Sequence, residues 1–105
     1  MYKIIFYVPE SHLECVKNAM FTQGAGRIGH YDCCAWQTKG QGQFRPQEGS
    51  KPFSGSVDNL SYVDEFKVEM ICSDTSIKPA IEALIASHPY ETPAFQYWPI
   101  EINTP

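Results

Sequence analysis

The alternation of hydrophobic and polar positions along the chain predicts four strands. Residues 2–8, YKIIFYV, form a run of aromatic and β-branched residues that suits a strand buried on at least one face. Residues 28–38, IGHYDCCAWQT, and 62–72, YVDEFKVEMIC, have the composition or alternation of strands, and in 62–72 we expect the face carrying Phe66 to be buried. Residues 94–102, AFQYWPIEI, supply the last strand.

Two segments between these strands have the spacing of helices. The first covers about 11–23, where Ser11 and Glu14 form a capping-box pattern and Gly24 supplies a left-handed stop. The second ends near Ser87, because the residue that follows precedes a proline and is pushed out of the helical region.

The order strand, helix, strand, strand, helix, strand predicts an α+β, ferredoxin-like βαββαβ fold. In such a fold a four-stranded antiparallel sheet carries both helices on one face. The chain would be a single domain over 1–105, with a loop at 39–59 projecting between the second and third strands. The other sheet face carries Tyr, Trp and Phe side chains, and we expect homo-oligomerisation to cover them.

Composition narrows the class of protein. The chain has 105 residues, enough for one domain, and eight Lys and Arg against twelve Asp and Glu give a formal net charge of −4. Without a basic stripe, nucleic acid is not an expected partner, and no apolar run approaches the length of a membrane span. The apolar opening is too short for a secretory signal, and the four cysteines lack a CxxC pair, so we expect free thiols in the cytoplasm.

All seven glycines of the chain lie between Gly24 and Gly55. The first three, at 24, 26 and 29, match the GxGxxG pattern. That pattern binds dinucleotides only where it follows a strand and opens a helix, whereas here it follows a helix. We therefore expect a turn.

The segment after this turn offers candidate metal ligands. If residues 28–38 form a strand, His30 and Cys34 share one face and Cys33 lies on the other, and these three could hold a divalent copper or zinc ion. Their spacing is not a specific signature. Cys15 and Cys72 are expected instead to be buried as small apolar residues. The cofactor, if there is one, is not identified by the sequence.

Candidate catalytic groups are few. A thiolate of Cys33 or Cys34 would need His30 or His88 beside it, and His88 with Glu91 could form an acid–base pair. The HPYE segment is better explained as a corner in which proline ends the helix, the tyrosine packs and Glu91 anchors the turn. We therefore expect a protein that is not an enzyme.

The loop after the second strand combines cations with aromatic residues. Arg45 and Lys51 could bind a phosphate or carboxylate, with glycine amides as further donors. Phe44 and Phe53 are unusual in a solvated loop, so we expect the loop to be partly packed. The predicted site for a small ligand or protein partner comprises Gly42, Phe44, Arg45, Glu48 and Lys51.

Three strings in the chain resemble a known family: YKIIFYVPESH, the 24–55 tract with its GxFRPxEGxxPFxG core, and HPYETPAF. They are similar to the YqfO-type PII-like domain, found alone or inserted in the YqfO/YbgI family of dinuclear-metal proteins. HPYETP also resembles a segment of the trimeric CutA proteins. The resemblance implies a ferredoxin-like subunit, here as a standalone protein, that forms a trimer and meets ligands or partners near the loop or at subunit clefts.

The resemblance implies no known reaction. The metal ligands of the YqfO/YbgI proteins belong to domains that flank the insert, so none is transferred to this chain. We therefore expect a non-enzymatic PII/CutA-like binding or regulatory protein with its site in the 39–55 loop. The alternative is a copper- or zinc-binding protein that uses His30 with Cys33 or Cys34.

Overall fold

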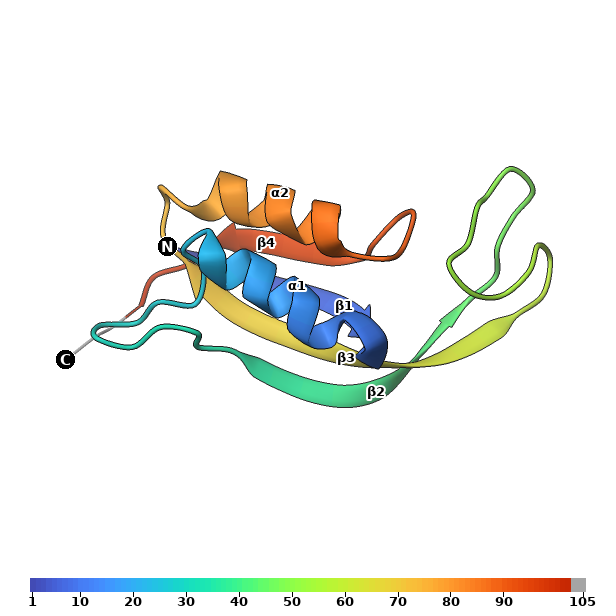
Figure 1. Ribbon diagram of the computed structural model, residues 1–105, viewed down its shortest axis with the longest axis horizontal. Helices are drawn as coiled ribbons and strands as arrows, with labels where there is room; N and C mark the ends of the chain where they lie inside the picture. The colour runs from blue at the N-terminus through green and yellow to red at the C-terminus, as the bar shows by residue number, and fades with distance from the viewer. Residues whose placement is uncertain (103–105) are drawn as a thin grey trace.

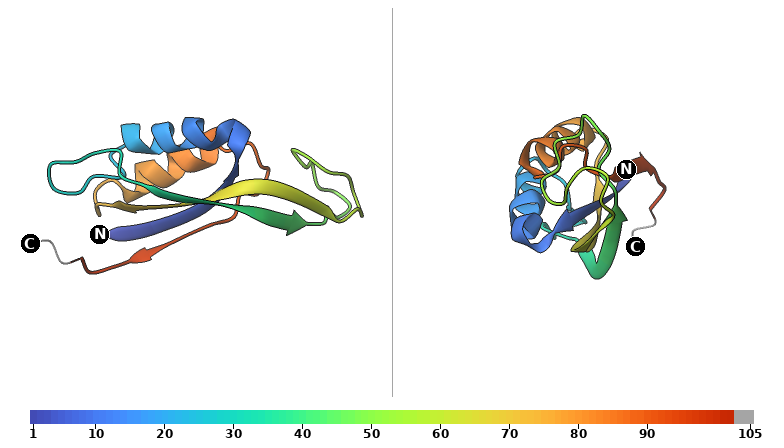
Figure 2. Two further views of the ribbon diagram at one scale, coloured as in Figure 1. Left: turned by 90° about the horizontal axis from the view of Figure 1, so that it is seen from below. Right: turned by 90° about the vertical axis from the view of Figure 1, so that its right-hand side faces the viewer.

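The computed structural model describes residues 1–102 and shows a four-stranded antiparallel sheet with both helices on one face (Figures 1 and 2). The strand order is β2-β3-β1-β4, and the predicted ferredoxin-like fold class is confirmed. None of the helices in these residues is long and apolar enough to cross a membrane. The elements are β1 (Tyr2–Pro9), α1 (Glu10–Thr22), β2 (Trp36–Phe44), β3 (Ser61–Cys72), α2 (Ile77–Ser87) and β4 (Phe95–Pro99).

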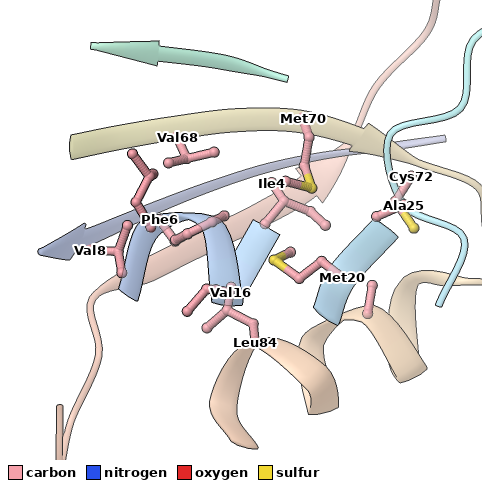
Figure 3. Packing of buried hydrophobic residues seen from close by; sticks show 12 residues of the cluster. Ile4, Phe6, Val8, Val16, Met20, Ala25, Val68, Met70, Cys72 and Leu84 are labelled. Atoms are coloured by element: carbon pink, nitrogen blue, oxygen red, sulfur yellow. The ribbon is translucent and has the colours of Figure 1, made fainter. Parts of the chain in front are cut away.

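The core lies between the two central strands and the helices (Figure 3). Phe6 of β1 stands directly opposite Val68 of β3, so both side chains point to the same face of the sheet. Met20 of α1 and Leu84 of α2 cover that face, and all four side chains are completely buried. Phe66 is partly buried against this cluster, as the alternation of β3 predicts.

The beginning of α1 differs from the prediction. The helix starts at Glu10, directly after Pro9, which is the last residue of β1 and also the N-cap. Ser11 therefore lies inside the first turn, and no side chain caps the helix. Because Pro9 has an extended backbone but needs no N–H partner, strand and helix join without a loop, and the predicted capping box does not form.

The end of α1 follows the prediction. Gly24 has φ of 101°, and its N–H donates to the Phe21 carbonyl at 3.0 Å while the Ala25 N–H donates to the Met20 carbonyl at 3.2 Å. These two bonds form a Schellman motif. The end of α2 is also as predicted, because His88 has the extended backbone that the following proline favours.

The prediction of a strand over residues 28–38 is wrong in its bounds. Residues 24–35 form a loop with one isolated bridge between Ile28 and Tyr31, and Cys33 has a left-handed φ of 55°. The extended geometry that would alternate the faces of His30 and the two cysteines is therefore absent. The strand begins at Trp36 and continues to Phe44, so the connecting loop covers 45–60 and not 39–59.

The polar sequence of β2 is explained by its place at the edge of the sheet. All of its residues except Gly42 and Phe44 are exposed. A strand that buries neither face needs no hydrophobic alternation, and pairing with β3 over nine residues holds it. This is why the segment after residue 38 resembles a loop in sequence.

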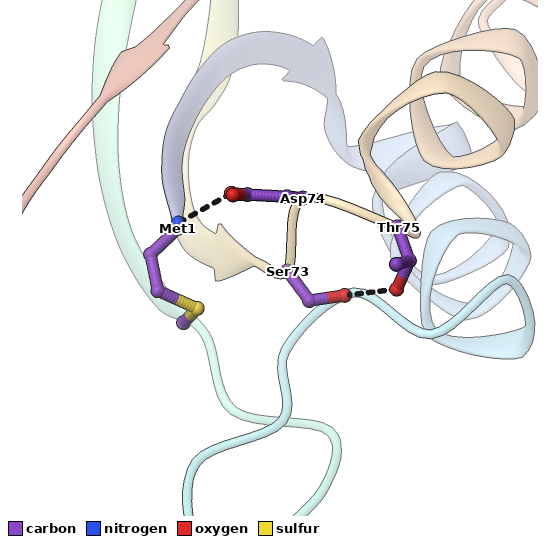
Figure 4. Close-up of polar contacts among 4 residues, drawn as sticks. All are labelled: Met1, Ser73, Asp74 and Thr75. Carbon is purple, nitrogen blue, oxygen red and sulfur yellow. Dashed lines mark hydrogen bonds and ion pairs between the residues drawn. The ribbon is translucent and has the colours of Figure 1, made fainter.

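The last strand is shorter than predicted and ends at Pro99. It pairs with β1 from Tyr2 to Phe6, and the N–H of Ile100 then donates to the Met1 carbonyl at 3.0 Å. The Met1 nitrogen pairs with Asp74 in the turn that leads into α2, beside the neighbouring Ser73 and Thr75 hydroxyls (Figure 4).

The β2–β3 hairpin extends well past the ends of the helices, and loop 45–60 at its tip turns back toward the body of the molecule (Figure 1). This extension gives the molecule a long axis of 50 Å against 23 and 22 Å for the other two. The hairpin, the returning loop and the segment after α2 together form the candidate site.

Candidate functional site

A cleft of about 440 Å³ lies between the β2–β3 hairpin, loop 45–60 and the segment 88–94. Its walls contain four aromatic side chains, two carboxylates and several small or apolar residues. The register of the sheet places all of its strand residues except Gln43 on the face turned away from the core. The aromatic residues are Tyr7, Phe44, Phe53 and Tyr90, and the carboxylates are Glu65 and Glu91.

Loop 45–60 is fastened over this cleft. The Lys51 backbone N–H donates to both carboxylate oxygens of Glu91, at 3.1 and 3.2 Å. The Phe53 ring meets the His12 ring of α1 edge-on at 5.6 Å between centroids, and lies 6.1 Å from the Tyr90 ring. Phe53 is therefore partly packed, as the presence of aromatic residues in the loop predicts, although about half of it stays exposed.

Tyr90 connects the segment after α2 to β3. Its hydroxyl donates to Oε2 of Glu65 at 3.1 Å. Burial, followed by the charge of Glu65 and this hydrogen bond, raises the pKa of Tyr90 to about 12. The phenol therefore stays protonated at physiological pH and acts as a donor.

Gly42 gives the Glu65 carboxylate its place. A Cβ built at Gly42 would fall on that carboxylate, whereas a Cβ at Gly40, two residues earlier in β2, would meet nothing within 4 Å. Of these two glycines, only Gly42 has a neighbour that would have to move to admit a side chain.

His88 holds the same segment in place through hydrogen bonds at both ring nitrogens. Its ring is buried, Nε2 lies 2.6 Å from the Tyr7 carbonyl, and the Tyr90 N–H donates to Nδ1 at 3.1 Å. With Nδ1 accepting, Nε2 carries the proton and donates to the carbonyl. Burial, the largest effect, lowers the pKa of His88, so the ring is held neutral. With both nitrogens engaged, His88 shapes the corner, and Tyr90 packs there as predicted. Glu91 is expected to anchor the turn, but the hydrogen bond that it accepts comes from Lys51 of loop 45–60, so this part of the prediction is wrong.

Two of the five predicted ligand-binding residues, Gly42 and Phe44, line the cleft. Arg45, Glu48 and Lys51 lie in the same loop with exposed side chains outside its lining, and Lys51 contributes its backbone N–H to the closure. Sequence reasoning missed the three residues contributed by the central strands, Tyr7, Val63 and Glu65, because no motif marks them.

The candidate metal ligands lie elsewhere. His30, Cys33 and Cys34 belong to the 24–35 loop, at the opposite end of the helix layer from His88 (Figure 1). Among residues 1–102, no three His, Cys, Asp or Glu side chains are grouped so that they could hold a metal ion. Metal binding by this loop stays a prediction. Cys15 is exposed, contrary to prediction, since it faces away from the core.

The fourth cysteine, Cys72, is buried as predicted, and burial raises the pKa of its thiol. It lies at the end of β3 within the hydrophobic core. A thiol in this setting is a packing group and a poor nucleophile.

Comparison of the whole structure with solved structures identifies the fold. CutA from Archaeoglobus fulgidus superimposes with a TM-score of 0.69 at 18% identity, over 99% of this chain and 88% of that one. The PII-like protein CutA from Nostoc sp. PCC 7120 gives 0.67 at 15% identity, over 96% and 82%. The chain has a CutA-like fold.

In sequence, this CutA-like chain is similar to one segment of longer proteins. It is 40% identical over 100 residues to a GTP cyclohydrolase 1 type 2 homolog of Halalkalibacterium halodurans, covering 95% of this chain and 27% of the relative. The Bacillus subtilis protein of that name is 41% identical over 99 residues, covering 94% of this chain and 26% of the relative. The chain thus spans about a quarter of the curated relatives it matches.

A solved structure agrees with this placement. The Bacillus cereus protein related to NIF3 superimposes with a TM-score of 0.82 at 34% identity, over 96% of the CutA-like chain and 26% of that protein. No family model matches the chain. The predicted resemblance to a PII-like domain is confirmed at the level of the fold and of this segment.

Proposed function

We propose that this protein is a non-enzymatic binding or regulatory protein whose ligand site is the cleft under loop 45–60. The observation that carries this proposal is the closure of the loop by Lys51, Glu91 and Phe53. A fastened loop leaves the cleft formed before any ligand arrives. Preformed, largely apolar clefts of this size are typical of small-molecule sites.

The predicted site residues take two roles in this proposal. Gly42 and Phe44 contribute to the cleft wall. Arg45, Glu48 and Lys51 are exposed on the loop, where they contact the part of a ligand or protein partner that projects from the cleft. An arginine in such a position donates two parallel hydrogen bonds to a carboxylate or phosphate.

The residues that line the cleft favour binding over chemistry. Nucleophilic catalysis needs a nucleophile held beside a base, and the lining contains Ser50 and Ser54 without a histidine. Its carboxylates already accept hydrogen bonds from Tyr90 and Lys51. The cyclohydrolase in the relatives' name refers to proteins about four times as long, and we propose that this segment supplies binding alone.

We also propose that the protein is a cytoplasmic homotrimer. The sheet face away from the helices has no covering layer among residues 1–102 (Figure 2). It carries Trp36, 68% exposed, on one edge strand and Trp98, 41% exposed, on the other. Copies of the chain packed on this face would bury both indoles. Light scattering should give three times the chain mass, and a monomer at micromolar concentration would contradict the assembly.

Mapping of small-molecule binding by amide chemical shifts tests the ligand site. We expect fragments that bind to shift the amides of loop 45–60 and of residues 88–94. Phe44→Ala should abolish these shifts. Tyr31→Ala, which removes a 76% exposed ring from the opposite end of the molecule, should leave them unchanged. Shifts confined to other surfaces would contradict the proposed site.

A further inference from the structure

We infer that the cleft binds an organic cation, in which an ammonium group is attached to an apolar body. This inference rests on the proposed function, because it names the ligand class of the same cleft. Two independent properties of the walls lead to it: negative charge that no protein cation among residues 1–102 pairs with, and aromatic rings that line the space beside that charge.

The charges of Glu65 and Glu91 are not neutralised. Both carboxylates accept hydrogen bonds from uncharged donors, the hydroxyl of Tyr90 and the backbone N–H of Lys51. Neither takes part in an ion pair among residues 1–102, and Lys67, two positions from Glu65 on the same strand face, makes none with it. A ligand cation would therefore meet two carboxylates that no protein cation already occupies.

The aromatic walls suit the same ligand. Tyr7, Phe44, Phe53 and Tyr90 surround the space, and the rings of Phe53 and Tyr90 lie 6.1 Å apart and tilted by 47°. The face of an aromatic ring carries negative charge density and attracts a cation within about 6 Å of its centre. The same rings, with Pro46 and Val63, offer apolar surface to the body of the ligand.

An anion fits these walls less well. Arg45 and Lys51, the cations of the loop, do not line the cleft. A carboxylate or phosphate drawn inside would approach Glu65 and Glu91 and would be repelled by both. An anion bound by Arg45 and Lys51 would therefore lie outside the aromatic walls.

Three probes of similar size and different charge separate these cases: benzylammonium, benzyl alcohol and benzoate. Each is titrated into the isotope-labelled full chain, and amide shifts report both affinity and location. We expect benzylammonium to bind in the cleft at least about fivefold more tightly than benzyl alcohol, and benzoate to bind more weakly than both. Added salt should weaken the binding of benzylammonium more than that of the other two probes.

Two variants remove one charge each and keep one side-chain oxygen that can accept a hydrogen bond. Glu65→Gln and Glu91→Gln should each weaken the binding of benzylammonium about five- to tenfold and leave the affinity for benzyl alcohol unchanged. Glu82→Gln, on the exposed side of α2, removes the same charge at a distance and should change neither. Nuclear Overhauser contacts from the Phe53 ring to the His12 and Tyr90 rings, kept in the ligand-free variants, will show that the cleft is intact.

The outcomes distinguish this inference from the proposed function. Equal binding of all three probes in the cleft, or tightest binding of benzoate with loss in Arg45→Ala, would overturn the cation inference and leave the ligand site standing. Absence of cleft shifts with every probe would overturn both. Preference for benzylammonium that survives both glutamine variants would also overturn the inference.

Discussion

The Glu91 carboxylate accepts the backbone N–H of Lys51, forty positions earlier in the chain, at 3.1 and 3.2 Å. This contact ties the tip of a long hairpin to the corner after α2. We predict that Glu91→Ala speeds hydrogen exchange of the Lys51 amide about fivefold or more, because a bond worth about 1 kcal/mol is lost. The free energy of unfolding should change by less than about 1 kcal/mol, since Glu91 is exposed.

Glu91→Gln is the matched control, because it keeps an oxygen that can accept the Lys51 N–H. Exchange at Lys51 in this variant should stay close to that of the unmodified protein. An equal increase in both variants, or no increase in Glu91→Ala, would show that the carboxylate does not hold the loop.

Gly42 and Gly40 offer a paired test of the Glu65–Tyr90 contact. Gly42→Ala places a methyl group where the Glu65 carboxylate lies, so that carboxylate must move away from the Tyr90 hydroxyl. We predict that the pKa of Tyr90 falls below about 12 but stays above the usual value of about 10, since burial is the larger cause. Gly40→Ala has open space and should not change it.

The measurement is a titration of the Tyr90 ring-carbon chemical shift at high pH. Because the folded-state pKa of this phenol is raised, its contribution to stability is present below about pH 10 and is lost as pH rises through about 12. An unchanged Tyr90 titration in Gly42→Ala would contradict the described geometry.

His88 predicts how stability depends on pH. Its folded-state pKa lies below the usual 6.5, so the unfolded chain binds the proton more readily. The stability that the neutral ring contributes is therefore complete above pH 6.5 and decreases as pH falls from there toward the folded-state pKa. Urea unfolding at a series of pH values between 5 and 8 should show this decrease.

The variant His88→Gln removes the titrating group. It should lower the free energy of unfolding by about 1–3 kcal/mol at neutral pH, because buried hydrogen bonds are lost, and it should flatten the decrease at lower pH. His30→Gln, at an exposed histidine, should keep both stability and pH dependence. If the free energy of unfolding of His88→Gln still decreased with falling pH as in the unmodified protein, groups other than His88 would be responsible for that decrease.

The predicted metal site can be tested by metal analysis and thermal unfolding. If His30, Cys33 and Cys34 bind zinc or copper, protein purified without chelators contains stoichiometric metal, and added metal raises the melting temperature. Cys34→Ser should remove that rise, whereas Cys15→Ser, at an exposed thiol of α1, should keep it. A protein without metal and without a thermal shift would exclude this function.

The fold could be predicted from the sequence wherever packing against the core dictates the pattern. Residues 2–8 and 62–72 carry the apolar alternation of the two central strands, and Gly24 and Pro89 mark the helix ends. The bounds of β2 could not be predicted, because an exposed edge strand has no apolar face to reveal it. Its GQGQ segment has the glycine-rich, polar composition that is typical of a loop.

The candidate site was predictable in part for a similar reason. The tract from Gly42 to Phe53 and the HPYE corner are local signals, and residues from both line the cleft. Glu65 and Tyr7 become part of it only through the pairing of β3 with β1 and β2. Without knowledge of that register, the sequence points to the loop cations Arg45 and Lys51, which lie outside the lining.

Loop 45–60 is docked on the corner after α2 and so forms a cleft in the ligand-free protein. Nuclear Overhauser contacts between aromatic ring protons test it most directly. We expect contacts from the Phe53 ring to the rings of His12 and Tyr90, whose centroids lie 5.6 and 6.1 Å away. Absence of these contacts, together with fast motion of the backbone amides of residues 47–57, would contradict it.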